Sequence, residues 1–153
     1  MQIRIIAVDK IRQGYAAAAC AELRKRLAPY YAYEEIEVKA AHGGDPAAAT
    51  AEESERVRRL LRPDDRVWLL ERSGTQLSSV GLSKRLLTAA ESPSPRLTMI
   101  IAGTYGASAV LRERAEFLWS LSALTLLHEW ARMLVLEQLY RAAKIARNEP
   151  YHH

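Results

Sequence analysis

The chain has 153 residues, of which 49% are hydrophobic and 26% charged, and its formal net charge is +4 at pH 7. This composition is ordinary for a globular protein and excludes disordered and fibrous classes, and the length suits a single domain, residues 1–153, with its own core. The single cysteine, Cys20, excludes an intrachain disulfide and a cysteine-rich zinc site, and the mild basic excess permits a polyanionic partner without requiring one.

Apolar segments of strand character alternate with helical segments along the chain. In chain order, we expect strands near 3–8, 36–38, 67–70, 97–103 and 117–121, and helices near 12–28, 46–61, 78–91, 108–116 and 128–147. Asp45 before Pro46 predicts a capped helix start, whereas Pro29 and Pro63 mark helix ends. This alternation predicts an α/β fold, a mostly parallel sheet with helices on both faces.

Three of the expected strands are followed by loops that could form one pocket. The loops are ERSG at 71–74, AGTYG at 102–106 and SALTLL at 122–127. Ligands of open α/β sheets bind beyond the carboxyl ends of strands, so these loops meet if their strands are neighbours. The hydroxyls of Ser120, Ser122 and Thr125 need partners if buried, either locally at an ordinary strand end or around a ligand. Their place in the chain favours the ligand.

Several common signatures are missing. The sequence has no phosphate-binding G-x-x-x-x-G-K-[ST], no G-x-G-x-x-G after the first strand, and no G-x-S-x-G of hydrolases. His128-Glu129 begins like the zinc motif H-E-x-x-H but does not complete it, so we expect no metal. MQIRIIAVDK lacks the apolar core of a secretory signal, and no apolar run approaches the roughly 18–20 residues of a membrane span. We therefore expect a cytoplasmic protein without a membrane partner.

The last helix has an apolar stripe and a charged arc. We expect the stripe to face the core and to comprise Ala131, Leu134, Val135, Leu139, Ala142 and Ala146. The charged arc comprises Glu129, Arg132, Glu137, Arg141, Lys144 and Arg147, with Trp130, Met133 and Tyr140 among them. These three are either scattered surface residues or a second buried contact, a dimer interface.

Several stretches of the sequence resemble those of a known family. The block 118–153, LWSLSALTLLHEWARMLVLEQLYRAAKIARNEPYHH, closely resembles the C-terminal region of the RlmH family of SPOUT-class rRNA methyltransferases. MQIRIIAV, VWLLERSGTQLSSVGLSKRL and MIIAGTYG resemble the family's opening strand, central region and glycine loop. The most specific element is S-x-S-x-x-T followed by histidine, then E-Q-L-Y-R-A, K-I and a terminal P-Y-H.

The resemblance implies a fold and an activity. Its members are small homodimers with a C-terminal deep trefoil knot, which here covers about 67–147 and leaves a tail at 148–153. They bind S-adenosylmethionine and methylate N3 of a pseudouridine in helix 69 of large-subunit rRNA within the assembled ribosome. The alternatives are a non-catalytic RNA- or ribosome-binding protein that kept the SPOUT fold, and a SPOUT methyltransferase for another RNA.

Carried onto this sequence, the resemblance assigns site residues. The cofactor would be held by Leu70, Ala102, Gly103, Leu121, Ser122, Ala123, Leu124, Thr125 and Leu126. A base for the imide proton would be His128, at the pocket's exit, or the tail pair Tyr151 and His152. His128 is equally well read as a helix-capping residue, the tail as a frayed end, and His152 with His153 as the remnant of a tag. Arg132 and Arg141 would contact RNA or remain in pairs within the helix.

Three positions depart from the family's pattern. Ala102 stands where a glycine is usual, and its methyl group is tolerable only if the backbone φ there is not positive. Leu127 replaces a proline before the histidine, which loosens the turn. Asp9 stands near a family glycine, which we interpret as a surface matter. The first two touch the predicted pocket and leave the non-catalytic alternative open.

Overall fold

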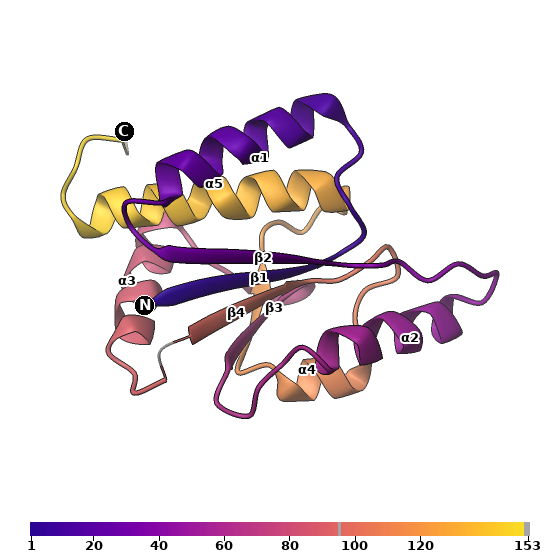
Figure 1. The fold of residues 1–153 in the computed structure, drawn as a ribbon. Helices are drawn as coiled ribbons and strands as arrows, with labels where there is room; N and C mark the ends of the chain where they lie inside the picture. The colour runs from indigo at the N-terminus through magenta and orange to yellow at the C-terminus, as the bar shows by residue number, and fades with distance from the viewer. Residues whose placement is uncertain (95, 152–153) are drawn as a thin grey trace.

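Five parallel strands form one sheet in the order β2-β1-β4-β3-β5 (Figure 1). The structure is a computed structural model and describes residues 1–94 and 96–151. The strands are β1 (Gln2–Val8), β2 (Ala32–Val38), β3 (Arg66–Gln76), β4 (Arg96–Ile101) and β5 (Phe117–Ser120). The helices are α1 (Gly14–Leu27), α2 (Pro46–Arg58), α3 (Ser79–Ala90), α4 (Ala109–Arg114) and α5 (His128–Ala146). The predicted parallel α/β architecture is confirmed.

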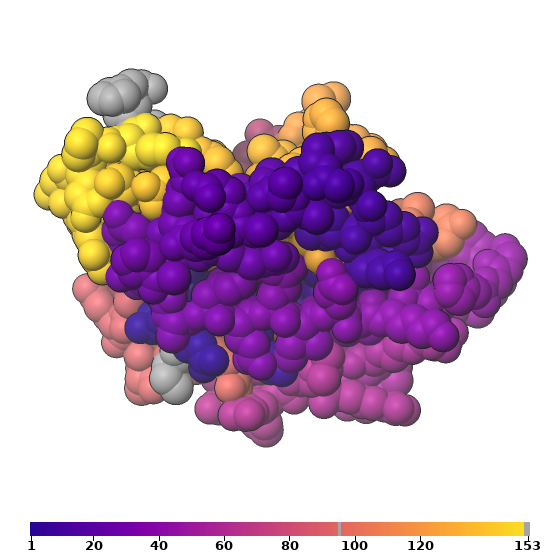
Figure 2. Space-filling model, turned by 45° about the horizontal axis from the view of Figure 1, so that its top comes forward, coloured from indigo at the N-terminus to yellow at the C-terminus, as the bar shows by residue number. Residues whose placement is uncertain are grey.

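Helices cover both faces of the sheet, as the alternating pattern predicts. On one face α5 lies between α1 and α3 and contributes Val135, Leu136 and Leu139 to the larger core. On the other face α2 and α4 supply Val57 and Leu111 to a smaller core. Figure 2 shows α1 on the outside of the face that α1, α5 and α3 cover, with the C-terminal end of α5 beside it. The central strands β1 and β4 are buried on both sides, which explains their almost uninterrupted apolar sequences.

The N-terminus of α2 forms as its sequence predicts. Both carboxylate oxygens of Asp45 accept hydrogen bonds from the free amides of Ala47 and Ala48, at 3.1 and 3.2 Å. Pro46 occupies the first helical position, where a missing N–H costs nothing. This cap fixes where α2 begins and therefore which of its residues point toward the sheet.

Strand β3 continues beyond the point where the sequence predicts a turn. Leu70 and Thr75 both pair with Trp119 of β5, so residues 71–74 bulge out of the ladder and the chain then returns to it. Gly74 closes this bulge against β5, because a Cβ there would lie 2.4 Å from the Leu118 carbonyl oxygen. The ERSG segment is thus an excursion held within a strand.

Arg132 corrects the predicted division of α5 into a core stripe and a charged arc. Its side chain is 1% exposed, although the sequence places it on the outer arc, and Leu134, predicted to face the core, is 39% exposed. The buried arc is displaced because the acceptors of Arg132, on β2 and in the loop after β1, lie on the side of the sheet that α5 covers. As a consequence, the predicted contact of Arg132 with RNA is not possible from this position.

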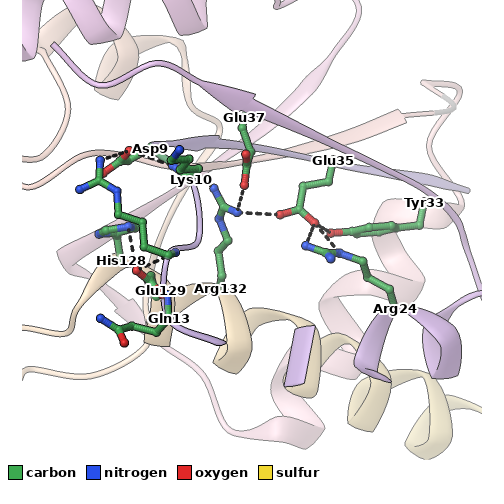
Figure 3. Close-up of polar contacts among 11 residues, drawn as sticks. Asp9, Lys10, Gln13, Arg24, Tyr33, Glu35, Glu37, His128, Glu129 and Arg132 are labelled. Atoms are coloured by element: carbon green, nitrogen blue, oxygen red, sulfur yellow. Dashed lines mark hydrogen bonds and ion pairs between the residues drawn. The ribbon is translucent and has the colours of Figure 1, made fainter. Parts of the chain in front are cut away.

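The buried guanidinium meets three acceptors from two other segments (Figure 3), while its Nε has no hydrogen-bond partner among the described residues. Its Nη1 lies 3.2 Å from Glu35 Oε1 and 2.6 Å from Glu37 Oε1, both on β2, and its Nη2 donates to the carbonyl oxygen of Asp9. Glu35 also accepts from Arg24 Nε of α1 at 2.7 Å and from the Tyr33 hydroxyl at 2.8 Å. These pairs tie α5, β2, α1 and the loop after β1 into one ionic network.

Asp9 has more than the surface role that its sequence position indicates. Its φ is 69°, in the left-handed region that glycine adopts freely and that Asp tolerates better than most residues. This conformation accompanies a chain reversal after β1 in which the Asp9 carbonyl meets Arg132. The positive φ explains why a glycine is expected near residue 9. Asp9 adopts the same conformation, and its carboxylate accepts a hydrogen bond from Lys10 N–H at 2.9 Å.

We predict that Arg132→Met lowers the free energy of unfolding by about 3–5 kcal/mol, because it removes the donor of the Asp9 carbonyl and a cation beside the largely buried Glu35 carboxylate. Urea denaturation at fixed protein concentration measures the change. The control is Arg26→Met, which removes an exposed i,i+4 pair with Glu22 and should change stability little. Equal effects of the two substitutions would show that the network contributes no more than a surface pair.

Candidate functional site

A cavity of about 590 Å³ opens at the carboxyl ends of β3, β4 and β5. Its walls come mainly from residues 70–72, 101–106, 121–122 and 124–128, in and beside the three loops that the sequence singles out. A cavity of this size is typical of sites for small molecules and cofactors. Of the predicted cofactor residues, those that line it are Leu70, Ala102, Gly103, Leu121, Ser122, Leu124, Thr125 and Leu126, whereas Ala123 does not.

Two small residues form the wall at the end of β4. Ala102 has no positive φ, since Asp9 and Asn148 are the described non-glycine residues with one, so its methyl group meets the condition set by the sequence. Gly103 is required by close approach: a Cβ there would lie 2.4 Å from Glu53 Oε2 and 3.1 Å from Val8 Cγ1. The chain then turns sharply, with Gly106 at φ 82° donating its N–H to the Gly103 carbonyl at 3.0 Å.

Helix α2 supports this turn from behind. Glu53, 6% exposed, accepts from Ala41 N–H at 2.9 Å through Oε1, while its buried Oε2 faces Gly103 without a hydrogen-bond partner among the described residues. The neighbouring Ser54 accepts from Ser108 N–H at 3.0 Å. These contacts set the position of the Gly103 turn relative to the sheet.

The hydroxyls of the loop after β5 are satisfied locally, and the loop still lines the cavity. Ser120 Oγ donates to the Ser122 carbonyl at 3.0 Å, and Ser122 Oγ accepts from Leu124 N–H at 3.0 Å. Thr125 accepts from Arg72 Nη1 at 3.3 Å. The hydroxyls thus have protein partners, as at an ordinary strand end, and they shape a loop that forms a wall of the cavity. That this loop surrounds a ligand stays a prediction.

Leu127 occupies the position where a proline is usual without distorting the turn. Its φ is −61° and its ψ 140°, angles that a proline would also adopt. The loosening expected from the missing proline is therefore confined to the unfolded chain, because the folded backbone already has the conformation that a proline imposes.

His128 and Glu129 are the first two residues of α5 (Figure 3). His128 lines the cavity, and its buried Nε2 has no hydrogen-bond partner within the described residues. Glu129 accepts from the backbone N–H groups of Arg12 and Gln13 at 3.2 and 3.0 Å, which fastens the loop after β1 to α5. Desolvation raises the pKa of the Glu129 carboxyl, but these two N–H donors and the nearby His128 outweigh it and leave the pKa below its ordinary value. His128 is thus the predicted catalytic residue that the fold brings to the cavity.

Tyr151 lies at the other end of α5. The helix has 19 residues and spans about 28 Å, so Tyr151 is far from His128 within one chain. Its ring packs edge-on against Tyr140, with centroids 4.8 Å apart, and under Arg141, whose Cζ lies 4.7 Å from the ring centroid. Arg141 is also paired with Glu137 at 2.6 Å. His152, the other predicted tail residue, and His153 lie outside the described residues.

Two charged residues of the cavity wall escaped the sequence analysis. Glu71 and Arg112 both line the cavity, and Arg112 Nη2 lies 2.9 Å from Glu71 Oε2. Glu71 directly follows a buried strand, a position that is a signal in itself, whereas Arg112 carries none, because α4 brings it to the cavity only through the tertiary fold.

None of the helices in the described part of the chain combines the length and hydrophobicity that a bilayer span needs. Within residues 1–94 and 96–151, no group of three or more His, Cys, Asp or Glu side chains is arranged to hold a metal ion.

Comparison with known proteins covers the whole chain. A family model described as a predicted SPOUT methyltransferase matches residues 1–152. The chain is 40% identical over 154 residues to ribosomal RNA large subunit methyltransferase H of Gloeobacter violaceus. This match covers 100% of this chain and 99% of that protein. The proteins of the same name from Dictyoglomus thermophilum and a Synechococcus species are 36% and 40% identical, and each match covers at least 94% of both chains.

We predict that Gly103→Ala lowers the free energy of unfolding by about 1–3 kcal/mol, because the added methyl group collides with the Glu53 carboxylate. Placing the same substitution in a Glu53→Ala background should cost less, since that change removes the colliding atoms. The double-mutant cycle, measured by urea denaturation, reports the coupling between the two positions. Additive effects would mean that Glu53 does not support the turn.

Proposed function

The chain belongs to the SPOUT methyltransferase family, and from this membership we propose that it is an S-adenosylmethionine-dependent methyltransferase of large-subunit ribosomal RNA. The observation that carries the proposal is the cavity of about 590 Å³ among the three strand-end loops. Those loops carry the residues that resemble the family's motifs. Such a substrate also assigns the protein to the cytoplasm, where ribosomes work.

The walls of the cavity fit this methyl donor. Aliphatic side chains of the 121–126 loop and Leu70 offer apolar surfaces to an adenine ring. Ala102 and Gly103 also line the cavity, and with side chains this small the main-chain N–H and C=O groups beside them can recognise a ligand. When bound, the donor supplies the electrophilic methyl group, and the protein supplies positioning.

We further propose that the modified atom is N3 of a pseudouridine, with His128 close to the chemistry. This nitrogen is an imide and must lose its proton before it can accept a methyl group, which a neighbouring base assists. His128 lines the cavity, and its buried Nε2 has no hydrogen-bond partner among the described residues, so this nitrogen keeps its capacity to bond a substrate group once binding brings one to it. Its neighbour Glu129 is fixed by two backbone donors, which holds the start of α5 in place.

A role for the tail requires a second copy of the chain. The length of α5 separates Tyr151 from the cavity of its own chain. If the tail takes part in methyl transfer, it acts on the cavity of a partner, which supports a homodimer. Arg141, 25% exposed and beside Tyr151, remains a proposed RNA contact in that arrangement, whereas Arg132 does not.

The start of α5 offers an apolar surface for such a partner. Trp130 and Leu134 are 48% and 39% exposed, and Leu127 before them is 67% exposed. Trp130 Nε1 donates to the exposed Tyr15 hydroxyl at 3.0 Å, which adds a ring from α1. Tyr140, by contrast, packs within its own chain against Tyr30 and Tyr151. We therefore base the proposed interface on Trp130 and its apolar neighbours.

The knotted part of the family's fold is proposed for residues of about 67–147, with the tail following. The excursion of β3 at 71–74 is the segment that supports it, because Gly74 lies against Leu118 and Arg72 reaches Thr125 beyond β5. The first strands and α1 then form the rest of the same domain.

The non-catalytic alternative loses the observations that favoured it. Ala102 has an ordinary φ, and Leu127 has a proline-like backbone, so neither departure deforms the cavity. Methylation of another RNA remains an alternative within the same reaction class.

We predict that the purified protein transfers labelled methyl groups to ribosomes from cells lacking its gene, and that deletion of residues 150–153 lowers the rate by about a hundredfold or more, as loss of a catalytic group would. Calorimetry should show S-adenosylmethionine binding nearly unchanged by the truncation, since none of the residues proposed to hold the cofactor belongs to the tail. Mass spectrometry of the rRNA identifies the product.

Binding without transfer to any ribosomal particle would contradict the enzyme and favour the RNA-binding protein. Transfer at the full rate by the truncated chain would leave His128 alone as the candidate base.

We predict that the protein is a dimer at micromolar concentration and that Trp130→Glu makes it a monomer, because the charge would lie in the apolar interface. Light scattering measures the molar mass. Val110→Glu is the matched control: Val110 is 57% exposed on α4, on the opposite face of the sheet, so this variant should remain a dimer. A wild-type monomer would contradict both the interface and the shared tail.

A further inference from the structure

The ion pair of Glu71 and Arg112 is the main charged feature of the cavity wall. Glu71 lies in the excursion of β3 and its side chain is 13% exposed, whereas Arg112 comes from α4 and its side chain is 45% exposed. Glu71 is the one acidic side chain among the described residues that line the cavity. The pair therefore places one negative and one positive group side by side in a wall whose other polar side chains are Arg72, His128 and several hydroxyls.

Both partners keep unused hydrogen-bonding capacity. Arg112 Nε donates to the Ala107 carbonyl at 3.3 Å and Nη2 meets Glu71, which leaves Nη1 without a protein partner among the described residues. Glu71 Oε1 has only long contacts with Ser73, 3.3 Å to Oγ and 3.5 Å to N. A carboxylate can accept about four hydrogen bonds and a guanidinium can donate five, so each group can bind a further charged partner.

A ligand that satisfies both groups must carry a cation and an anion close together. An α-amino acid group has this chemistry, with an ammonium that donates to a carboxylate and a carboxylate that accepts from a guanidinium. A ribosomal phosphate would satisfy Arg112 but would be repelled by Glu71, which argues against RNA as the partner of the pair. Arg72, the other arginine of the wall, is already bonded to Thr125.

We propose that Glu71 and Arg112 form the subsite for the α-amino acid group of the methyl donor, Glu71 accepting from its ammonium and Arg112 donating to its carboxylate. This inference rests on the proposed function, because it assumes that the cavity binds S-adenosylmethionine. The pair determines specificity: it distinguishes a nucleoside that carries an amino acid from one that does not. It takes no part in proton transfer.

Two nucleosides test the subsite directly. S-adenosylhomocysteine and 5′-methylthioadenosine are both uncharged thioethers at sulfur and share the adenosine group, but only the first carries the amino acid. Calorimetry with the full chain should show that Glu71→Gln and Arg112→Gln each weaken the binding of S-adenosylhomocysteine about tenfold or more, as loss of a charge-assisted hydrogen bond does. The affinity for 5′-methylthioadenosine should change less than about twofold, because adenosine contacts remain.

Matched controls separate the subsite from general charge effects. Glu113→Gln and Arg59→Gln remove charges of the same kind at exposed positions that do not line the cavity, and should leave both affinities unchanged. Thermal melts of the variants show whether the fold is retained.

The pattern of losses decides the inference. If the substitutions weaken the binding of both nucleosides equally, the pair has a purely structural role. If they weaken the binding of neither, the pair interacts with RNA or solvent and not with the cofactor. Each result overturns the subsite alone. A wild-type protein that binds neither nucleoside would overturn the proposed cofactor site, and the subsite with it.

Discussion

The guanidinium of Arg132 is the contact through which the helical layer and the edge of the sheet are fixed to each other. It is buried, and its partners come from β2 and from the chain reversal after β1. A long arginine side chain enclosed in this way allows α5 one rotation about its axis, because any other would bury the charge without acceptors. That rotation is what turns His128 toward the cavity at one end of the helix and exposes Trp130, two residues later, on another side of the helix.

The shape of the cavity depends on two glycines, where the absence of a side chain lets segments of the chain pack closely. At Gly74 and Gly103 the main chain approaches a neighbouring strand or helix more closely than any Cβ would allow. The first lets the excursion of β3 settle on β5, and the second lets the turn after β4 rest on Glu53. Polar contacts then hold what the glycines permit: Ser54 meets Ser108, and the hydroxyls of Ser120 and Ser122 fold the third loop upon itself. The site is thus shaped by backbone, with few charged groups in its wall.

The sequence predicts the sheet and the position of the cavity because both follow from local patterns. Leu70, Gly103 and the residues of the 121–126 loop other than Ala123 line the cavity, since they lie at or just after the carboxyl ends of strands and parallel strands share an edge. Arg132 was misplaced, because its acceptors on β2 lie almost a hundred residues away and helical periodicity reports only the helix. The pairing of Glu71 with Arg112 and the continuation of β3 past Leu70 were invisible for the same reason: each is decided by a segment that meets it only in the folded chain.

The network around Arg132 also bears on how the protein is made. During synthesis, β2 emerges with Glu35 and Glu37 long before the helix that carries their arginine. Until then Glu35 has Arg24 as a partner, but Glu37 has none of the native ones, and β1 lacks β4 as a neighbour. Contacts so distant along the chain form late and slowly. The N-terminal half therefore waits in an incomplete state, and a nascent chain that is interrupted before α5 remains exposed to proteases and aggregation.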